Sequence, residues 1–312
     1  MLDHHYARIR LGFGDGSGGA LFNRGRHRWA ALRTILAIFV VAIASCAHTA
    51  DDNQKGTGSG RFTLPRGSDE VMIEVSSGGG LVLPVVRVDD SLPRVWISGD
   101  GRYLRQSATG ADTPVLVAME ERRIPEAALQ NLLTEASNAG LLADSPDYGT
   151  PKIFDAVNTR ILLVADGRRH DVLVRALGYP VAGLDAATVA ARERVSRFID
   201  LLEHPERITG VGTPSPYPPT GVAVFVLGPA AASATKPAAM WPVGDLATAG
   251  TPTNWPAAST RCFVVTDADL RAVTAAASGT SRTAPWRSGD ALWEIAMRPL
   301  LPDEHTCADV VG

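Results

Sequence analysis

The chain has 312 residues, of which 45% are hydrophobic and 20% are charged, and this length suffices for two small domains or one large domain with an ample core. Residues 1–45 hold six arginines and only two aspartates, so residues 46–312 keep 24 of the 30 basic and 31 of the 33 acidic residues, a net charge of −7. This excess of acid argues against nucleic acid as a partner, and against a body that lies flat on an anionic membrane.

An apolar run near the N-terminus is typical of an export signal. Thr34 to Ser45 contains twelve residues without a charge, whereas a helix that crosses the hydrocarbon core needs about 20. The shorter run suits the hydrophobic region of a signal peptide. The arginines that precede it suit the positively charged region on the cytoplasmic side. The sequence therefore predicts export from the cytoplasm.

The end of this run, Ile43-Ala44-Ser45-Cys46, resembles the lipobox of bacterial lipoproteins. The resemblance implies a diacylglycerol on the sulfur of Cys46 and cleavage before it, and thus a signal peptide over residues 1–45. Acyl chains such as palmitate would then hold the protein at the extracytoplasmic face of the cell membrane without a spanning helix. The alternatives are an uncleaved signal anchor and an ordinary secretory signal with a cysteine nearby.

The chain has three cysteines, and lipidation of Cys46 leaves Cys262 and Cys307 as a pair. Two such cysteines in an exported protein usually form a disulfide bond, because that environment is oxidising. The bond would stabilise the fold by about 4 kcal/mol in the chain-entropy model. The alternatives are two free buried thiols, or a metal pair for which only His305 lies near in sequence.

Residues 46–61 are small and polar, which predicts a flexible tether between the lipid anchor and a first module over residues 62–206. We expect strands bounded by Gly, Asp and Pro, a hairpin at Asp166-Gly167, and two helices, the second of which exposes Arg192 to water. The expected strands are 71–75, 81–88, 94–98, 102–106, 114–120, 159–165 and 171–176, and the expected helices are 125–140 and 185–204.

Five prolines lie between Pro205 and Thr220, which excludes a regular element there and predicts a linker at residues 207–220. A smaller α+β module over residues 221–312 follows. Its Ala/Pro/Thr-rich residues 228–260 form a long loop, and loops of that length are usually functional or disordered. The whole chain predicts the α+β class, with mainly antiparallel sheets, helices packed on one face, and two modules. The second module's expected strands are 221–227, 261–265 and 291–297, and its expected helix is 267–277.

The sequence contains no recognisable catalytic, cofactor-binding or metal-binding motif. None of His170, His204 and His305 has a metal-ligand spacing, and no nucleophile elbow, Walker loop or dinucleotide-binding motif occurs. The carboxylate pairs Asp89-Asp90 and Glu120-Glu121 are adjacent residues, whose side chains point to opposite faces of a strand. We therefore expect no cofactor and no metal. A catalytic site assembled from distant residues stays an alternative.

The long loop holds the candidate ligand surface. Trp241 and Trp255 each precede a proline in this loop, and aromatic rings on loops can stack on a sugar, a lipid or a side chain of a partner. The competing interpretation is that both rings pin an irregular loop onto the sheet.

Two segments of the body, Leu292 to Cys307 and Gly99 to Arg102, resemble uncharacterised secreted proteins of high-GC Gram-positive bacteria, a resemblance that implies no activity. The sequence thus indicates a lipid-anchored extracytoplasmic protein of the cell envelope. The function it favours is a non-catalytic binding or accessory module, whose partner is an envelope protein or a glycan or lipid ligand. The alternative is a cell-envelope hydrolase whose site is not visible in the sequence.

Overall fold

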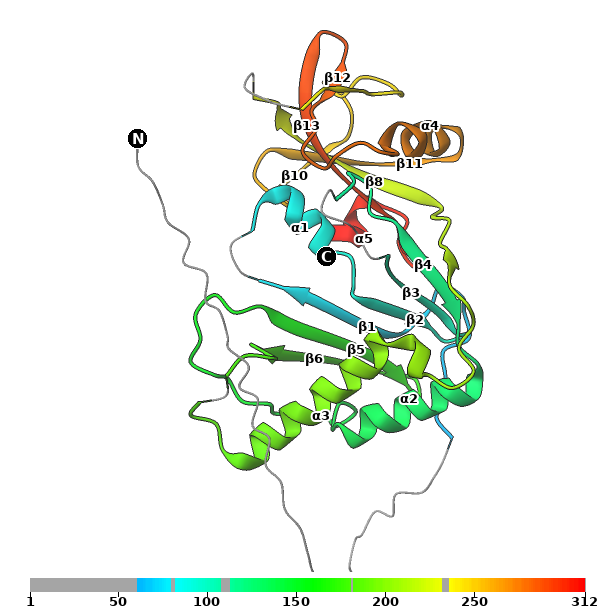
Figure 1. Ribbon diagram of the computed structural model, residues 1–312, viewed down its shortest axis with the longest axis vertical. Coiled ribbons are helices and arrows are strands. Elements are labelled where there is room, and N and C mark those ends of the chain that lie inside the picture. Colours follow the sequence, from blue (N-terminus) through cyan, green and yellow to red (C-terminus); the bar gives the residue numbers. More distant parts are fainter. Residues whose placement is uncertain (1–60, 80–81, 108–112, 181, 232–235, 312) are drawn as a thin grey trace, which may run out of the picture. The chain divides into compact units, whose positions relative to one another are not determined.

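The computed structural model describes residues 61–79, 82–107, 113–180, 182–231 and 236–311 (Figure 1). The predicted signal peptide, Cys46 and the tether up to residue 60 lie outside the described residues. Within the described part, no helix is long and apolar enough to cross a membrane. Two mainly antiparallel sheets and their helices confirm the predicted α+β class.

The first sheet has seven strands in the order β6-β5-β1-β2-β3-β4-β7, and every neighbouring pair is antiparallel. β5 and β6 form the predicted hairpin. Its turn residues Asp166 and Gly167 have φ angles of 53° and 70°, the left-handed pair that a tight two-residue hairpin requires. The strands are β1 (Val71–Gly78), β2 (Val95–Ser98), β3 (Arg102–Gln106), β4 (Met119–Arg123), β5 (Asn158–Ala165), β6 (Arg168–Arg175) and β7 (Ser215–Pro216).

Two long helices, α2 (Glu126–Asn138) and α3 (Ala186–Glu203), cover one face of this sheet (Figure 1). The N-terminus of α3 is capped by Asp185, whose side chain accepts a hydrogen bond from the amide of Thr188 at 2.9 Å. In both helices the apolar side chains recur at the predicted helical spacing, and they form one core with the strands. The buried helix residues are Ala128, Leu129, Leu132, Leu133, Ala136, Val195, Phe198, Ile199 and Leu202.

The second sheet has six strands in the order β10-β11-β8-β13-β12-β9, and it buries apolar side chains on both faces. Helix α4 (Asp267–Ala277) packs on one face, while α1 (Pro84–Asp90) and α5 (Cys307–Val311) pack on the other. The β9–β12 pair is parallel, and the other pairs are antiparallel. The strands are β8 (Gly221–Pro229), β9 (Ala239–Met240), β10 (Thr251–Thr253), β11 (Thr260–Thr266), β12 (Trp286–Ser288) and β13 (Ala291–Pro299).

The predicted disulfide bond is present. It joins Cys262 on β11 to Cys307 at the start of α5, and their Cα atoms lie 6.1 Å apart. Neither free thiols nor a metal pair therefore describes these two cysteines. The bond ties the last helix of the chain to the second sheet.

The strand expected at 81–88 is wrong, and the strand expected at 114–120 is wrong in part. The run 81–88 is rich in valine, but α1 begins at Pro84, because a proline fits the first turn of a helix and cannot donate to a strand ladder. The strand expected at 114–120 starts only at Met119. Before it, Pro114 and Leu116 make isolated bridges to the second module, to Ser281 and Met297.

Two segments expected to be irregular contribute regular elements. The proline-rich residues 205–220 contain a 3₁₀ turn, η1 (Pro205–Arg207), and the edge strand β7, where a proline costs no ladder bond on its open side. The loop 228–260 contains β9 and β10, which lie at opposite edges of the second sheet. The module boundary stays a prediction, since α1 comes from the first module's residues and packs on the second sheet.

Arg192 on α3 is buried rather than exposed, with a fractional exposure of 3%. Its Nη1 donates to the carbonyl of Tyr148 at 3.0 Å, and its Nη2 donates to the carbonyls of Arg175 and Ala176 at 2.8 and 2.6 Å. The forked guanidinium thus satisfies three backbone acceptors at once, two of them at the end of β6. Helical spacing alone cannot reveal this role.

Candidate functional site

The first sheet has a second face, turned away from α2 and α3. Strand alternation decides which residues lie on it. Ile73, Val75 and Ile161 belong to the helix-covered core, so Glu74 and its cross-strand neighbour Leu162 point the other way. Asp171 on β6 pairs with Leu162 and continues the same row.

One half of this face is covered by the end of the chain. Leu301 packs there against Trp96 and Leu104 in a small buried cluster. The tyrosine Tyr217 in the same cluster donates its hydroxyl to the carbonyl of Leu300 at 2.9 Å. Residues 300–311, here called the C-terminal segment, therefore cover part of β2, β3 and β4 with apolar side chains.

A buried ion pair holds this segment in place. Arg298, whose side chain is 1% exposed, donates through Nη2 to the carboxylate of Glu304, with 2.6 Å to Oε1. The same carboxylate accepts the amide of Leu301 at 2.8 Å, and Nη1 of Arg298 donates to the hydroxyl of Ser91 at 3.0 Å. The two charges are thus paired and hydrogen-bonded, as burial requires.

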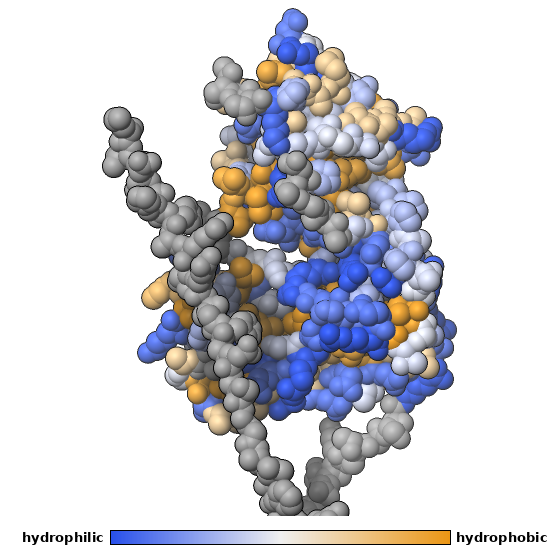
Figure 2. Space-filling view, viewed as in Figure 1, coloured by the Kyte–Doolittle hydropathy of each residue, from blue (hydrophilic) through white to orange (hydrophobic). Residues whose placement is uncertain are grey.

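Over the other half of the face, a cleft of about 620 Å³ separates the strands from the C-terminal segment. The space-filling view shows the molecule hollowed between these two parts (Figure 2). One wall consists of β1, β5 and β6, with Glu74, Arg160 and Leu173. The opposite wall carries Trp255 from the long loop and Asp303 beside α5.

The charged groups in the cleft are perturbed or paired. Arg160 donates through Nε to Asp171 at 2.8 Å, so these two groups form an exposed ion pair on the sheet. Burial raises the pKa of Glu74 above its ordinary value, and the charge of Asp303 raises this pKa further against the opposing charge of Arg160. Burial also raises the pKa of Asp303. Glu74 and Asp303, which both line this cleft, therefore each have a raised pKa.

The two tryptophans of the predicted ligand surface have different surroundings. Trp241 is 7% exposed and lies edge-on to Trp286 and Phe263, with ring centroids 5.7 and 6.0 Å away. Trp255 is half-buried, contacts Phe225 edge-on at 5.1 Å, and lines the cleft. The packing interpretation describes Trp241, whereas Trp255 meets the cleft with part of its surface.

The histidines of the described residues do not line the cleft. His170 pairs with Leu163 of the helix-covered core, His204 ends α3 with Nδ1 3.1 Å from Oδ1 of Asp200, and His305 is exposed. Among the residues that the structure describes, no group of three or more His, Cys, Asp or Glu side chains could hold a metal ion.

The adjacent carboxylates Glu120 and Glu121 point to opposite faces of β4, as expected. Glu120 accepts from Nε of Arg105 at 2.7 Å, and Glu121 accepts from Nε of Arg102 at 2.9 Å. Both are therefore engaged in cross-strand ion pairs.

The other pair, Asp89-Asp90, ends helix α1 rather than lying in a strand. Asp89 is buried, and its Oδ2 lies 2.8 Å from Nη1 of Arg282. This carboxylate links α1 to the second module.

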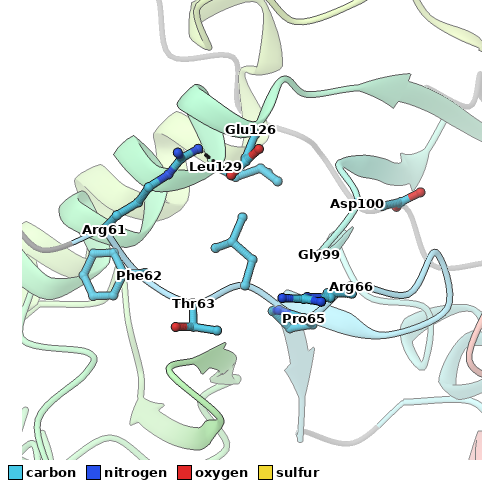
Figure 3. A pocket seen from close by; sticks show the side chains of 10 residues that line it. Arg61, Phe62, Thr63, Pro65, Arg66, Gly99, Asp100, Glu126 and Leu129 are labelled. Carbon is cyan, nitrogen blue, oxygen red and sulfur yellow. Dashed lines mark hydrogen bonds and ion pairs between the residues drawn. The ribbon is translucent and has the colours of Figure 1, made fainter.

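A second hollow, of about 590 Å³, lies where residues 61–66 cross the start of α2. Figure 3 shows the ion pair of Arg61 with Glu126 at one side of it, and Arg66 and Asp100 at the other. All four of these charged residues are exposed. The cleft is the better candidate site because it holds two carboxyl groups with raised pKa values, Glu74 and Asp303, whereas the pKa of Asp100 in the second hollow is lowered.

Sequence reasoning missed Glu74, Arg160 and Asp303, which come from three distant segments. One signal was available: Glu74 is the lone charge in the apolar run of β1. Comparisons with protein-family models, with curated proteins and with solved structures gave no significant match. The site is therefore interpreted from its own geometry.

Proposed function

We propose that this protein is a lipid-anchored extracytoplasmic binding protein, and that the cleft between the first sheet and the C-terminal segment receives its ligand. The proposal rests on one observation, namely how firmly the wall that contains Asp303 and α5 is held in place. The Arg298–Glu304 pair and the Cys262–Cys307 bond hold that wall. A wall fixed by a buried ion pair and a covalent bond is preorganised, and preorganisation lowers the cost of binding.

The lining of the cleft favours a glycan of the cell envelope as the ligand. Trp255 and Leu173 offer apolar surface to the C–H face of a sugar. The exposed Arg160–Asp171 ion pair offers hydrogen-bond donors and acceptors to the hydroxyl groups of a sugar. A site with an aromatic wall and a few fixed polar groups is typical of small-molecule recognition.

Binding of solubilised peptidoglycan fragments tests the proposal, with tryptophan fluorescence as the readout. Trp255→Ala should abolish the fluorescence change and weaken binding by at least about tenfold. Trp241→Phe is the matched control, because it alters a core ring outside the cleft and should leave affinity within about twofold while lowering stability. Equal affinity of the wild type and the Trp255→Ala variant would remove the cleft as the site.

The anchor is tested separately. Cys46→Ala should release the protein from membranes or stall its processing, because no other residue supplies the thiol that the lipid requires. Membrane fractionation of cells that produce the variant measures this. A variant that is processed and still fractionates with membranes would contradict the lipid anchor.

A second candidate function is hydrolysis of an envelope glycan. The observation that favours it is the pair Glu74 and Asp303, both with raised pKa values, together with Ser76 beside Glu74. A carboxyl group with a raised pKa is a better proton donor than an ordinary carboxylate and can act as a general acid. Glu74→Gln should then stop the release of reducing ends from peptidoglycan while binding persists. If the wild type releases none, the binding function alone stands.

A further inference from the structure

The two sheets differ in how their edges end. Three of the four edge strands, β7, β9 and β10, are two or three residues long. Short edge strands are a common means of preventing unwanted pairing. The fourth edge strand, β6, has eight residues that pair with β5 in one unbroken register. Among the described residues, no strand pairs with its other side.

The backbone of β6 offers a regular row of hydrogen-bonding groups on that side. The amide of Ala176 donates to the carbonyl of Val157 at 3.2 Å, so Ala176 and every second residue before it direct their N–H and C=O groups toward β5. Alternation then turns the N–H and C=O groups of Arg169, Asp171 and Leu173 outward. The outward carbonyl of Arg175 is already bound by Nη2 of Arg192, so the free row ends there.

The side chains along this edge are basic. Arg169 and Arg175 are exposed, and Arg168 is held by Asp144 in an exposed ion pair. The one carboxylate of the strand, Asp171, is bound by Arg160 of β5. An added strand would therefore meet an excess of positive charge, which complements acidic side chains.

We propose that β6 binds an extended acidic segment of a partner protein, which adds as a further strand to the first sheet. The added strand would extend the face that carries Glu74 and Asp171, and it would border the cleft, whose lining includes the side chains of Arg169 and Leu173. This partner surface goes beyond the proposed function and does not depend on it.

A second copy of the chain is a poorer occupant. Two β6 strands that pair antiparallel with the longest overlap would be centred on Asp171 or on Val172. The first register places Asp171 opposite itself, and the second places Arg169 opposite Arg175. Like charges directly opposite each other on one face destabilise the pairing.

The test uses a short labelled peptide of alternating glutamate and valine, with the lysine and valine analogue as its counterpart. The acidic peptide should bind the whole protein at low salt, and the basic peptide should not. Leu173→Pro removes one outward N–H and leaves the ladder to β5, so it should weaken binding at least about fivefold. Leu173→Ala is the matched control, which keeps this N–H and should bind as the wild type does.

A charge reversal and hydrogen exchange complete the test. Arg169→Glu combined with Arg175→Glu should transfer the preference to the basic peptide. In the wild type, the bound peptide should slow amide exchange at Arg169, Asp171 and Leu173, while the amides of Val172 and Val174 are already protected by β5. Trp255→Ala should leave peptide binding unchanged, which separates this surface from the glycan cleft.

Three outcomes would overturn the proposal. These are binding of neither peptide, equal binding of both peptides, and undiminished binding by a folded Leu173→Pro variant. Self-association of the chain that depends on β6 would instead identify a second copy as the occupant.

Discussion

Two halves of one face of the first sheet follow the same strand alternation, but one half is buried and the other half faces a cleft. Over β2 and β3, Trp96 and Leu104 are buried beneath Leu301. Over β1, β5 and β6, Glu74 and Arg160 face a cleft. The sequence of the strands alone does not explain why one half is buried and the other open, because the open half also contains a buried apolar residue, Leu162. The difference arises because the C-terminal segment packs on one half of the face and leaves the other half uncovered.

The same segment therefore does two things. It completes the core of the first sheet, and it supplies a wall of the cleft. A site built in this way is as rigid as the contacts that fix the segment, namely the Arg298–Glu304 pair and the Cys262–Cys307 bond. Removing either contact should loosen the covered half and the open half together.

The largest effect is expected from the buried ion pair. Glu304→Ala should lower the free energy of unfolding by about 3–5 kcal/mol, because it leaves the guanidinium of Arg298 buried without its carboxylate. Urea unfolding followed by circular dichroism measures this. Asp303→Ala is the matched control on the cleft side, and it should change the stability by less than about 1 kcal/mol. Equal losses in the two variants would show that the pair does not hold the segment.

The disulfide bond is expected to have the next largest effect. Replacing both Cys262 and Cys307 with serine should lower the free energy of unfolding by about 2–4 kcal/mol, because the bond closes a long loop, with a sequence separation of 45 residues. Thermal unfolding with and without reductant measures this. Reductant should bring the wild type to the level of the double variant and leave the double variant unchanged. A double variant as stable as the oxidised wild type would contradict the role of the bond.

A buried carboxyl group near the covered half gives a pH-dependent prediction. Burial raises the pKa of Asp89 from 3.8 to about 6, although the charge of Arg282 lowers it in part. Its folded-state pKa exceeds the unfolded one. The stabilisation from its protonated form is therefore complete below about pH 4 and is lost as the pH rises through about 6.

Asp89→Asn mimics the protonated acid. It should raise the free energy of unfolding at about pH 8 by up to about 2–3 kcal/mol and leave it nearly unchanged at about pH 4. Asp90→Asn is the control, and its effect should be smaller because Asp90 is exposed. Urea unfolding at both pH values measures the difference. A gain that is equal at the two pH values would show that the titration of Asp89 is not its source.

The parts of the fold that the sequence predicted are those set by local rules. The apolar spacing in α2 and α3 and the Asp166-Gly167 turn depend only on neighbouring residues. The cleft depends on Glu74, Arg160 and Asp303, which are brought together only when the C-terminal segment crosses the sheet. The valines of α1 suit a strand as well as a helix, and only their burial against the second sheet decides between the two structures. Trp255 was a candidate from its loop position, but only packing distinguishes it from Trp241.

The smallest predicted effect concerns the β5–β6 hairpin, which carries both the open half and the basic edge. Gly167→Ala should lower the free energy of unfolding by about 1 kcal/mol, because the φ of 70° at this turn suits glycine and strains an alanine. Gly78→Ala is the matched control. At both glycines a Cβ atom would meet nothing within 4 Å, so the two positions differ in backbone conformation rather than in space. Gly78 lies in β1 and should tolerate alanine with no loss. Thermal unfolding of the two variants side by side measures this. Equal losses of stability in the two variants would mean that the left-handed turn does not set the β5–β6 register. The outward N–H and C=O groups of β6 depend on that register.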